Sequence, residues 1–224
     1  MAVSVKEIQE LRERTGVGMM DCKKALTEAD GNMDKAIEIL REKGMASAAK
    51  RQGKIASQGV VGSYIHMGGK IGVLVEVNCE SDFVARGDDF NNFVHDIAMQ
   101  IAASAPEYID SSEVPADRIA KEKEILLQQI MNDPKNAKKP EKIINMMIEG
   151  KIAKFYKEVC LMDQPFFKEP DITVTDYLHS MVAKIGEKLD IRRFARFVMG
   201  EGLAKKNEDL AAEVEAQMAA VKKN

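Results

Sequence analysis

Two runs of alternating apolar residues, separated by a pair of glycines, constrain the fold of this chain more than any other feature of its sequence. The first run covers residues 60–66 and the second residues 71–77, where every second residue is Ile or Val. This period of two places the apolar side chains on one face of an extended strand. Gly68 and Gly69 lie between the runs and indicate a tight turn, so residues 60–77 are predicted to form an antiparallel hairpin.

A hairpin of two strands is marginal by itself, so the rest of the chain has to supply cover for it. Residues 191–199 are rich in β-forming residues and are predicted to add a third antiparallel strand. Apolar residues recur at helical spacing in four stretches, which are residues 90–105, 115–131, 140–155 and 174–185. The predicted fold class is therefore α+β, with a small antiparallel sheet of about three strands covered by helices.

The first 44 residues show helical spacing, which residues 15–18 (TGVG) interrupt. Three short helices, the last of which is predicted to end at Gly44, indicate a small bundle. Residues 45–59 are rich in Ala, Ser, Lys and Gly, a composition that suits a linker or a loosely packed helix. We therefore predict one domain of residues 1–54 and a second of residues 55–224.

The balance of charges argues against nucleic acid as a direct ligand. The 224 residues carry a net charge of −3, whereas proteins that bind phosphate backbones concentrate positive charge. No stretch approaches the roughly 18 uninterrupted apolar residues of a membrane span, and the first residues do not resemble a targeting signal. The three cysteines are far apart in the sequence, which fits neither a disulfide framework nor a zinc cluster. We expect a cytoplasmic protein with reduced, buried thiols and no membrane contact.

The sequence lacks the arrangements of residues that enzymes require. It contains no glycine-rich nucleotide loop and no Gly-x-Ser-x-Gly nucleophile elbow. His95 and Asp96 are adjacent, but neighbouring positions of a helix diverge, so they do not form a catalytic pair. Asp88 and Asp89 resemble the first turn of a helix more than a metal-binding loop. We expect no enzymatic activity, no cofactor and no bound metal.

The strongest candidate site follows the second strand of the hairpin. Residues 78–85 (NCESDFVA) place a carboxylate, Asp82, next to an aromatic ring, Phe83, where the chain has to turn. A loop that leaves a rigid strand can hold such side chains out toward a partner. The alternative is that Phe83 is a core ring beneath the helix that starts at Phe90.

Met19 and Met20 form a second candidate site, in the N-terminal bundle. Adjacent positions of a helix point about 100° apart, so the two side chains cannot both face the same small core. We expect one methionine to pack inside. The other is predicted to form, with Val17, an adaptable apolar patch that suits a partner helix.

Two segments of the bundle resemble the N-terminal module of the elongation factor Ts family: residues 15–26 (TGVGMMDCKKAL) and 30–37 (DGNMDKAI). That module is built like a ubiquitin-associated domain, so a ubiquitin-type adaptor without exchange activity is the alternative function. Segments that resemble the core of the same family follow in the right order, at residues 62–66, 71–76, 81–85, 95–100, 164–166, 196–197 and 200–202. Ser81 stands where the family usually has threonine, and it keeps the hydroxyl group.

The resemblance implies a guanine nucleotide exchange factor that binds elongation factor Tu, both with GDP and without nucleotide. It implies that residues 81–84 displace Mg²⁺ from the nucleotide site of that partner. In this interpretation Phe83 is a wedge between partner helices, and Asp82 redirects polar groups near the metal. Ser81 and Val84 hold the shape of the segment.

The resemblance also implies further contacts. The N-terminal domain would bind the partner through Val17, Gly18, Met19, Met20 and Lys23. A last set of residues is assigned either to partner binding or to a dimer: His95, Met99, Leu210 and Val214. Leu210 and Val214 belong to a terminal helix that is predicted after Glu208. Longer members of the family contain two similar core halves and this chain contains one, so a homodimer is a further expectation.

Overall fold

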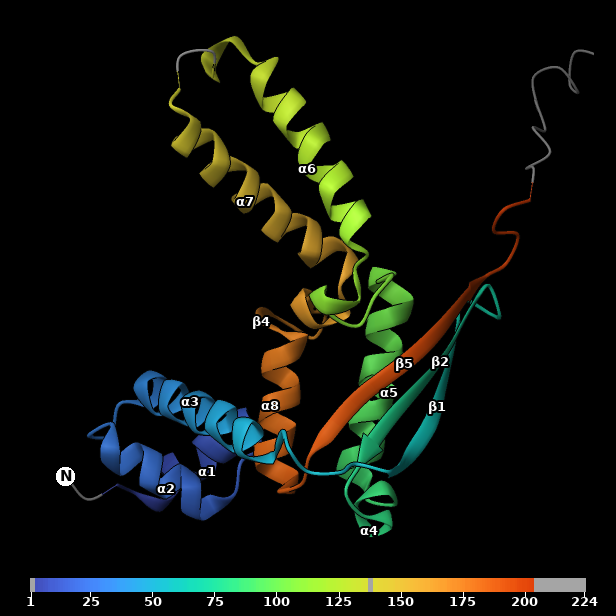
Figure 1. The fold of residues 1–224 in the computed structure, drawn as a ribbon. Coiled ribbons are helices and arrows are strands. Elements are labelled where there is room, and N and C mark those ends of the chain that lie inside the picture. The colour runs from blue at the N-terminus through green and yellow to red at the C-terminus, as the bar shows by residue number, and fades with distance from the viewer. Residues whose placement is uncertain (1–2, 137–138, 204–224) are drawn as a thin grey trace, which may run out of the picture.

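The computed structural model describes residues 3–136 and 139–203 (Figure 1). The three N-terminal helices form the predicted bundle and are α1 (Val5–Thr15), α2 (Met19–Glu28) and α3 (Met33–Arg51). α1 begins with a capping box, in which the Ser4 hydroxyl accepts from the Glu7 N–H at 3.2 Å and the Glu7 carboxylate accepts from the Ser4 N–H at 2.8 Å. The core of the bundle consists of Ile8, Leu11, Cys22, Ala25, Leu26, Ala29, Ala36 and Leu40.

The third helix is longer than the sequence predicted, because Gly44 is a contact point rather than a stop. α3 continues through Gly44 to Arg51. A Cβ atom at Gly44 would lie 3.4 Å from the backbone carbonyl oxygen of His179 in α8 (Val174–Ile185), so the glycine allows two helices to approach closely. The prediction that the helix ends at Gly44 is wrong. Of the two alternatives for residues 45–59, the helix is right as far as Arg51, but it is not loosely packed, because Ala48 packs against the main core.

The bundle docks on α8 through α3. The guanidinium of Arg41 lies 2.5 Å from the carboxylate of Asp176, and the same carboxylate accepts from the N–H and the hydroxyl of Thr173 at 3.0 and 2.8 Å. Burial disfavours the charged form of Asp176, but the hydrogen bonds from Arg41 and Thr173 outweigh it and hold its pKa below the usual range. One carboxylate therefore caps the start of α8 and orients the bundle.

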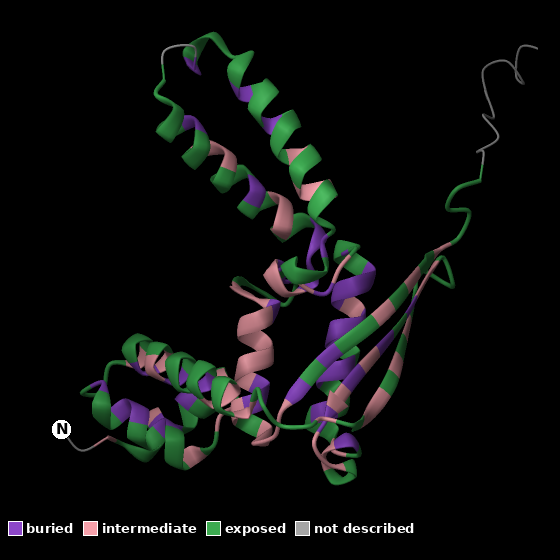
Figure 2. Ribbon diagram, viewed as in Figure 1, coloured by how far each residue is buried: buried purple, intermediate pink, exposed green. Residues whose placement is uncertain are grey.

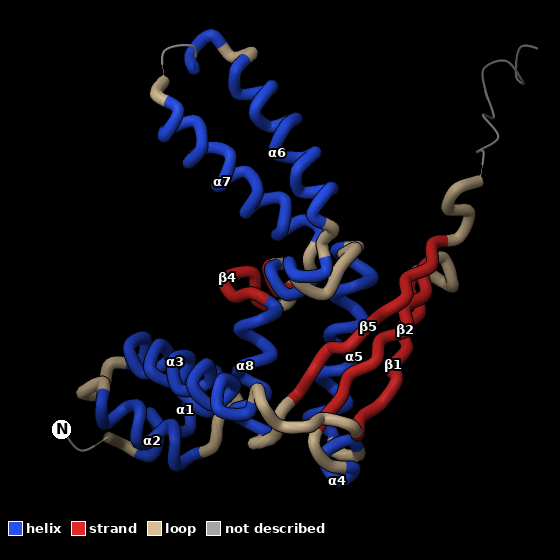
Figure 3. The backbone as a smooth tube through the Cα atoms, in the orientation of Figure 1, coloured by secondary structure: helices blue, strands red, loops and turns tan. Residues whose placement is uncertain are grey.

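The main sheet is antiparallel, with its strands in the order β1-β2-β5: β1 (Gln58–His66), β2 (Ile71–Cys79) and β5 (Leu189–Val198). The predicted hairpin and third strand are therefore confirmed. In the central strand, Val73, Val75 and Val77 are buried, whereas Leu74 between them is exposed. α5 (Asp88–Ser104) covers the inner face of the sheet (Figures 1 and 3).

The main core lies between the sheet, α5 and α8. Buried residues occur along most of α5 (Figure 2), which packs on the sheet and on α8. Phe90, Phe93, Ile97 and Ile101 of α5 are almost completely buried, at the helical spacing that the sequence shows. Asp88 and Asp89 lie in the first turn of α5, where negative charge is favourable.

A second, two-stranded sheet was not predicted from the sequence, which indicated only a break there. It consists of β3 (Pro165–Phe166) and β4 (Glu169–Thr173). The ring of Phe166 stacks on Tyr177, with the ring centroids 4.2 Å apart. The side chain of Gln100 in α5 donates to the Gln164 side chain at 3.1 Å and accepts from the Phe167 N–H at 2.8 Å. These contacts attach the small sheet to α5 and α8.

Two long helices form an arm that projects away from the main sheet (Figure 1): α6 (Ala116–Met131) and α7 (Glu141–Val159). At the base of the arm, Arg118 pairs with Glu107 and lies over the rings of Tyr108 and Phe155, at 5.4 and 5.5 Å from their centroids. In the part of the chain that the structure describes, no helix has the length and apolar character needed to cross a membrane.

Candidate partner-binding surfaces

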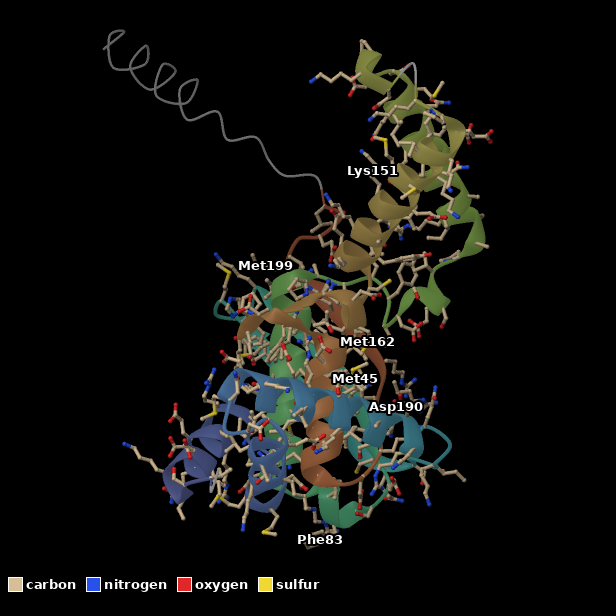
Figure 4. The ribbon with its side chains drawn as sticks, turned by 90° about the vertical axis from the view of Figure 1, so that its left-hand side faces the viewer. Met45, Phe83, Lys151, Met162, Asp190 and Met199 are labelled. Carbon is tan, nitrogen blue, oxygen red and sulfur yellow. The ribbon has the colours of Figure 1, made fainter. Side chains whose placement is uncertain are left out.

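A single helical turn after β2 presents Phe83 to solvent. This turn, α4 (Asp82–Ala85), starts at Ser81, whose hydroxyl accepts from the backbone N–H of Val84 at 3.3 Å. Phe83 is 89% exposed, and Figure 4 shows it at the lower end of the molecule. Ala85 takes the buried position of the turn. The alternative in which Phe83 is a core ring is therefore wrong. We call residues 81–85 the tip.

Asp82 and Arg86 flank the exposed ring and form an ion pair with each other. Their closest oxygen and nitrogen atoms are 2.5 Å apart, and both side chains are largely exposed. Exposed pairs contribute only about 0–1 kcal/mol to stability, so either group can change partners at low cost. Val84 is half-buried and packs against the main core. The tip and the neighbouring Arg86 therefore offer a partner one ring and two opposite charges.

Next to the ring lies an open groove of about 700 Å³. It is bounded by α4, the start of α5 and the end of α8, and it is lined by Phe83, Val84, Arg86, Gly87, Asp88, Asp89, Phe90, Lys184 and Ile185. The Lys184 ammonium lies 2.6 Å from the Asp89 carboxylate. Residues 3–136 and 139–203 contain no group of three or more His, Cys, Asp or Glu side chains that could hold a metal ion.

The N-terminal bundle exposes one of its two adjacent methionines. Met20 is 64% exposed, whereas Met19 is half-buried against the bundle core, as their angular separation predicts. Val17 is also half-buried against that core, and Gly18 and Lys23 are exposed. The structure therefore gathers these five residues at the start of α2.

His95 and Met99 lie on α5, away from the tip. The ring of His95 packs edge-on against Tyr64 of β1, with the ring centroids 5.4 Å apart, and Tyr64 belongs to the part of β1 nearest the hairpin turn. Met99 is half-buried. Leu210 and Val214 lie outside the described residues. The structure thus does not bring His95 or Met99 to the tip.

Two acidic residues that hold the tip do not stand out in the sequence. Glu187, in the loop between α8 and β5, accepts from the N–H of Ser81 at 3.0 Å and from its hydroxyl at 2.6 Å. Glu80 accepts from the backbone N–H of Lys188 at 2.7 Å and from Arg51 at 2.9 Å. Ser81 and Glu187 are 106 residues apart, so only the register of β2 against β5 could have indicated their contact.

Residues 5–201 match the model of the family described as Elongation factor TS. The chain belongs to the elongation factor Ts family. It is 61% identical over 218 residues to elongation factor Ts of Desulforamulus reducens, which covers 97% of this chain and 99% of that protein. It is 60% identical over 216 residues to elongation factor Ts of Carboxydothermus hydrogenoformans, with 96% and 98% covered. For elongation factor Ts of Acetivibrio thermocellus the identity is 59% over 216 residues, with 96% and 99% covered.

Membership of the elongation factor Ts family confirms the resemblance in the sequence and makes the protein a translation elongation factor. The family match runs through the bundle, the tip and the main sheet in one stretch. An adaptor domain joined to an unrelated core would match only in its first part. The elongation factor Ts family therefore accounts for the bundle and the core together.

Proposed function

We propose that this protein is a guanine nucleotide exchange factor, which binds GDP-loaded elongation factor Tu and promotes release of the nucleotide. The observation that carries the proposal is the tip, where an aromatic ring is 89% exposed in a member of the elongation factor Ts family. Aromatic side chains are enriched at surfaces that bind partners. The proposed place of action is the cytoplasm, where elongation takes place.

Such a factor makes and breaks no covalent bond, and it acts by changing the energetics of its partner. A nucleotide held with nanomolar affinity has about 12 kcal/mol of binding free energy and leaves slowly. A factor that weakens nucleotide binding is itself bound more weakly, by the same free energy, when nucleotide is present. The contacts of the factor must therefore favour the nucleotide-free state of elongation factor Tu.

Phe83 is suited to such a contact. We assign to it the role of a wedge that inserts between helices of the partner near its Mg²⁺ site. Burial of one aromatic side chain contributes about 1.5–3 kcal/mol. Asp82, which exchanges Arg86 for groups of the partner, redirects polar groups around the metal, while Ser81 and Val84 hold the turn. Mg²⁺ and phosphate then lose the ligands that retain the nucleotide.

The start of α2 provides a second attachment point in this proposal, with Met20 as its exposed anchor. An unbranched, polarisable side chain adapts well to the surface of a partner helix. The surface consists of Val17, Gly18, Met19, Met20 and Lys23. Two attachment points raise the effective concentration of the tip at its target. The docking of α3 on α8 keeps the two points in one geometry.

Release of a fluorescent GDP analogue from elongation factor Tu tests the proposed function. The full chain, added with excess unlabelled GDP, should accelerate release in proportion to its concentration until the partner is saturated. The control is the spontaneous release from elongation factor Tu alone. An unchanged rate at saturating factor contradicts exchange activity, and binding without acceleration favours the adaptor alternative.

The outer face of the main sheet suggests that two copies of the chain associate. Among the described residues, no helix or strand covers this face, and Phe197 on it is 67% exposed. The register places its side chains in adjacent rows, of which the first contains Ile65, Gly72 and Phe197 and the second Ser63, Leu74 and Ala195. Further along, Glu76 pairs with Arg192 and Arg193 at 2.7 and 2.6 Å.

We propose a homodimer through this face, because a two-fold axis can bring the apolar rows together and pair charges of opposite sign. His95 and Met99 lie on α5, which covers the other face, and are assigned to elongation factor Tu. Phe197→Asp should convert the dimer into a monomer in sedimentation velocity. Met131→Asp, the control, introduces the same side chain at an exposed position of the arm and should leave the dimer intact. A wild-type protein that sediments as a monomer throughout the micromolar range would refute this proposal.

A further inference from the structure

The two strands that lead to the tip remain joined beyond the end of their ladder. Backbone pairing of β2 with β5 ends at Cys79 and Leu189. At the next position the Glu80 carboxylate, instead of a backbone carbonyl, accepts from the N–H of Lys188 at 2.7 Å. One position further, the Glu187 carboxylate accepts from the N–H of Ser81 at 3.0 Å. Two carboxylates, one from each side, thus extend the ladder to the first residue of the tip.

Glu187 makes a second bond that reaches the helical turn itself. The Ser81 hydroxyl donates to Glu187 at 2.6 Å and accepts from the N–H of Val84 at 3.3 Å. Because the hydroxyl proton points at Glu187, an oxygen lone pair is left for the Val84 N–H. The turn has only four residues, which is far shorter than a helix that is stable by itself. Its geometry therefore depends on this cap.

We propose that Glu187 is a positioning residue for nucleotide exchange, which holds the tip so that Phe83 meets the partner already oriented. The inference rests on the proposed exchange function. A contact group that is ordered before binding loses less conformational freedom on contact than one that is ordered during it. Glu187 acts through Ser81, and in the described structure it touches Ser81 rather than Phe83.

The neighbouring carboxylate connects this support to the N-terminal bundle. Glu80 accepts from Arg51 at 2.9 Å, and the Lys188 ammonium donates to the backbone carbonyls of Gln52 and Lys54 at 3.1 Å each. The N–H of Lys188 and then Arg51 hold the pKa of Glu80 below its usual range, so Glu80 is ionised at neutral pH. The end of α3 is thereby bonded to the same short loop that supports the tip.

The test compares Glu187→Ala with Glu187→Gln and with Asp190→Ala. Asp190 lies three residues further along, is exposed, and its carboxylate makes no hydrogen bond to the described residues. Asp190→Ala therefore removes the same charge without touching Ser81, whose contacts are to Glu187. Figure 4 shows Asp190 well away from Phe83. In Glu187→Gln, the amide oxygen of the new side chain can still accept one of the two bonds from Ser81. This variant also keeps the proposal testable if Glu187→Ala does not fold.

Two measurements are made on each variant. Amide hydrogen exchange by NMR should show that the Ser81 and Val84 amides lose protection in Glu187→Ala, while the amides of α5 keep theirs. GDP release from elongation factor Tu at saturating factor should slow by roughly 3- to 10-fold, as expected for a contact group that becomes ordered only on binding. Glu187→Gln should lie between wild type and Glu187→Ala, and Asp190→Ala should match wild type.

The outcomes separate the two proposals. If Glu187→Ala leaves the Ser81 and Val84 amides protected, or loosens them without slowing release, the positioning role is overturned while the exchange function stands. If Asp190→Ala slows release as much as Glu187→Ala, the effect is one of charge and the positioning role is also overturned. If the wild-type protein does not accelerate release at all, the exchange function fails first, and the positioning role fails with it.

Discussion

Phe83→Ala should slow factor-promoted GDP release from elongation factor Tu by about 10- to 100-fold, the equivalent of losing the burial of one aromatic ring in the exchange step. The ring is 89% exposed in the free protein, so its removal leaves no cavity and should not change the stability of the fold. Affinity for GDP-loaded partner should fall much less, because the start of α2 provides a separate attachment. Stopped-flow release and equilibrium titration of the same samples measure the two effects.

Phe167→Ala is the matched control for this experiment. Phe167 is also partly exposed, at 39%, but it lies in the turn between β3 and β4, and its replacement should leave the release rate unchanged. Equal rates for wild type and Phe83→Ala would remove the wedge role from Phe83. Equal losses in rate and in affinity would instead make Phe83 an ordinary binding residue.

Gly59→Ala should destabilise the protein by about 3 kcal/mol, because backbone strain and a steric collision act at the same position. Gly59 has a φ of 139°, a backbone angle that residues with a Cβ rarely adopt. A Cβ there would lie 2.2 Å from the carbonyl oxygen of Val77 and 2.7 Å from the Cα of Asn78. Both neighbours belong to the backbone of the central strand, so neither can move aside as the end of a side chain could.

Urea denaturation, monitored by circular dichroism, measures the change in the free energy of unfolding. Gly200→Ala is the control, since Gly200 has a φ of 75° but nothing lies within 4 Å of its added Cβ. The control should show only the strain of a left-handed backbone, about 1 kcal/mol. If Gly59→Ala lost less unfolding free energy than Gly200→Ala, β1 would be able to shift without penalty, and the expected collision would be contradicted.

Periodicity was sufficient to predict the elements that bury a regular face. The hairpin and α5 follow from the spacing of apolar residues, because that spacing decides which side of a strand or helix turns inward. The third strand, β5, follows instead from its content of β-forming residues. The predicted end of the helix at Gly44 is wrong because a glycine within a helical pattern indicates a stop or a close contact equally well. Only the position of α8 distinguishes these two possibilities. β3 contains two residues, too few for any period to appear.

Only part of the candidate site could be predicted from the sequence. The segment with Phe83 could be located, but its exposure depends on a turn that places Ala85 inward, and the sequence left both alternatives open. The support for that turn could not be found, because Glu187 contacts Ser81 only after two strands far apart in the chain are in register. Local patterns carry no information about such a contact.

The place of β2 in the sheet bears on how the tip could work mechanically. Every residue of β2 pairs with β1 on one side and β5 on the other, and only Glu80 separates its last residue, Cys79, from the tip. A push against the tip is therefore directed largely along the strand, where it loads both rows of hydrogen bonds in shear at once instead of opening them one by one. A wedge on such a support can transmit force to its target without giving way itself.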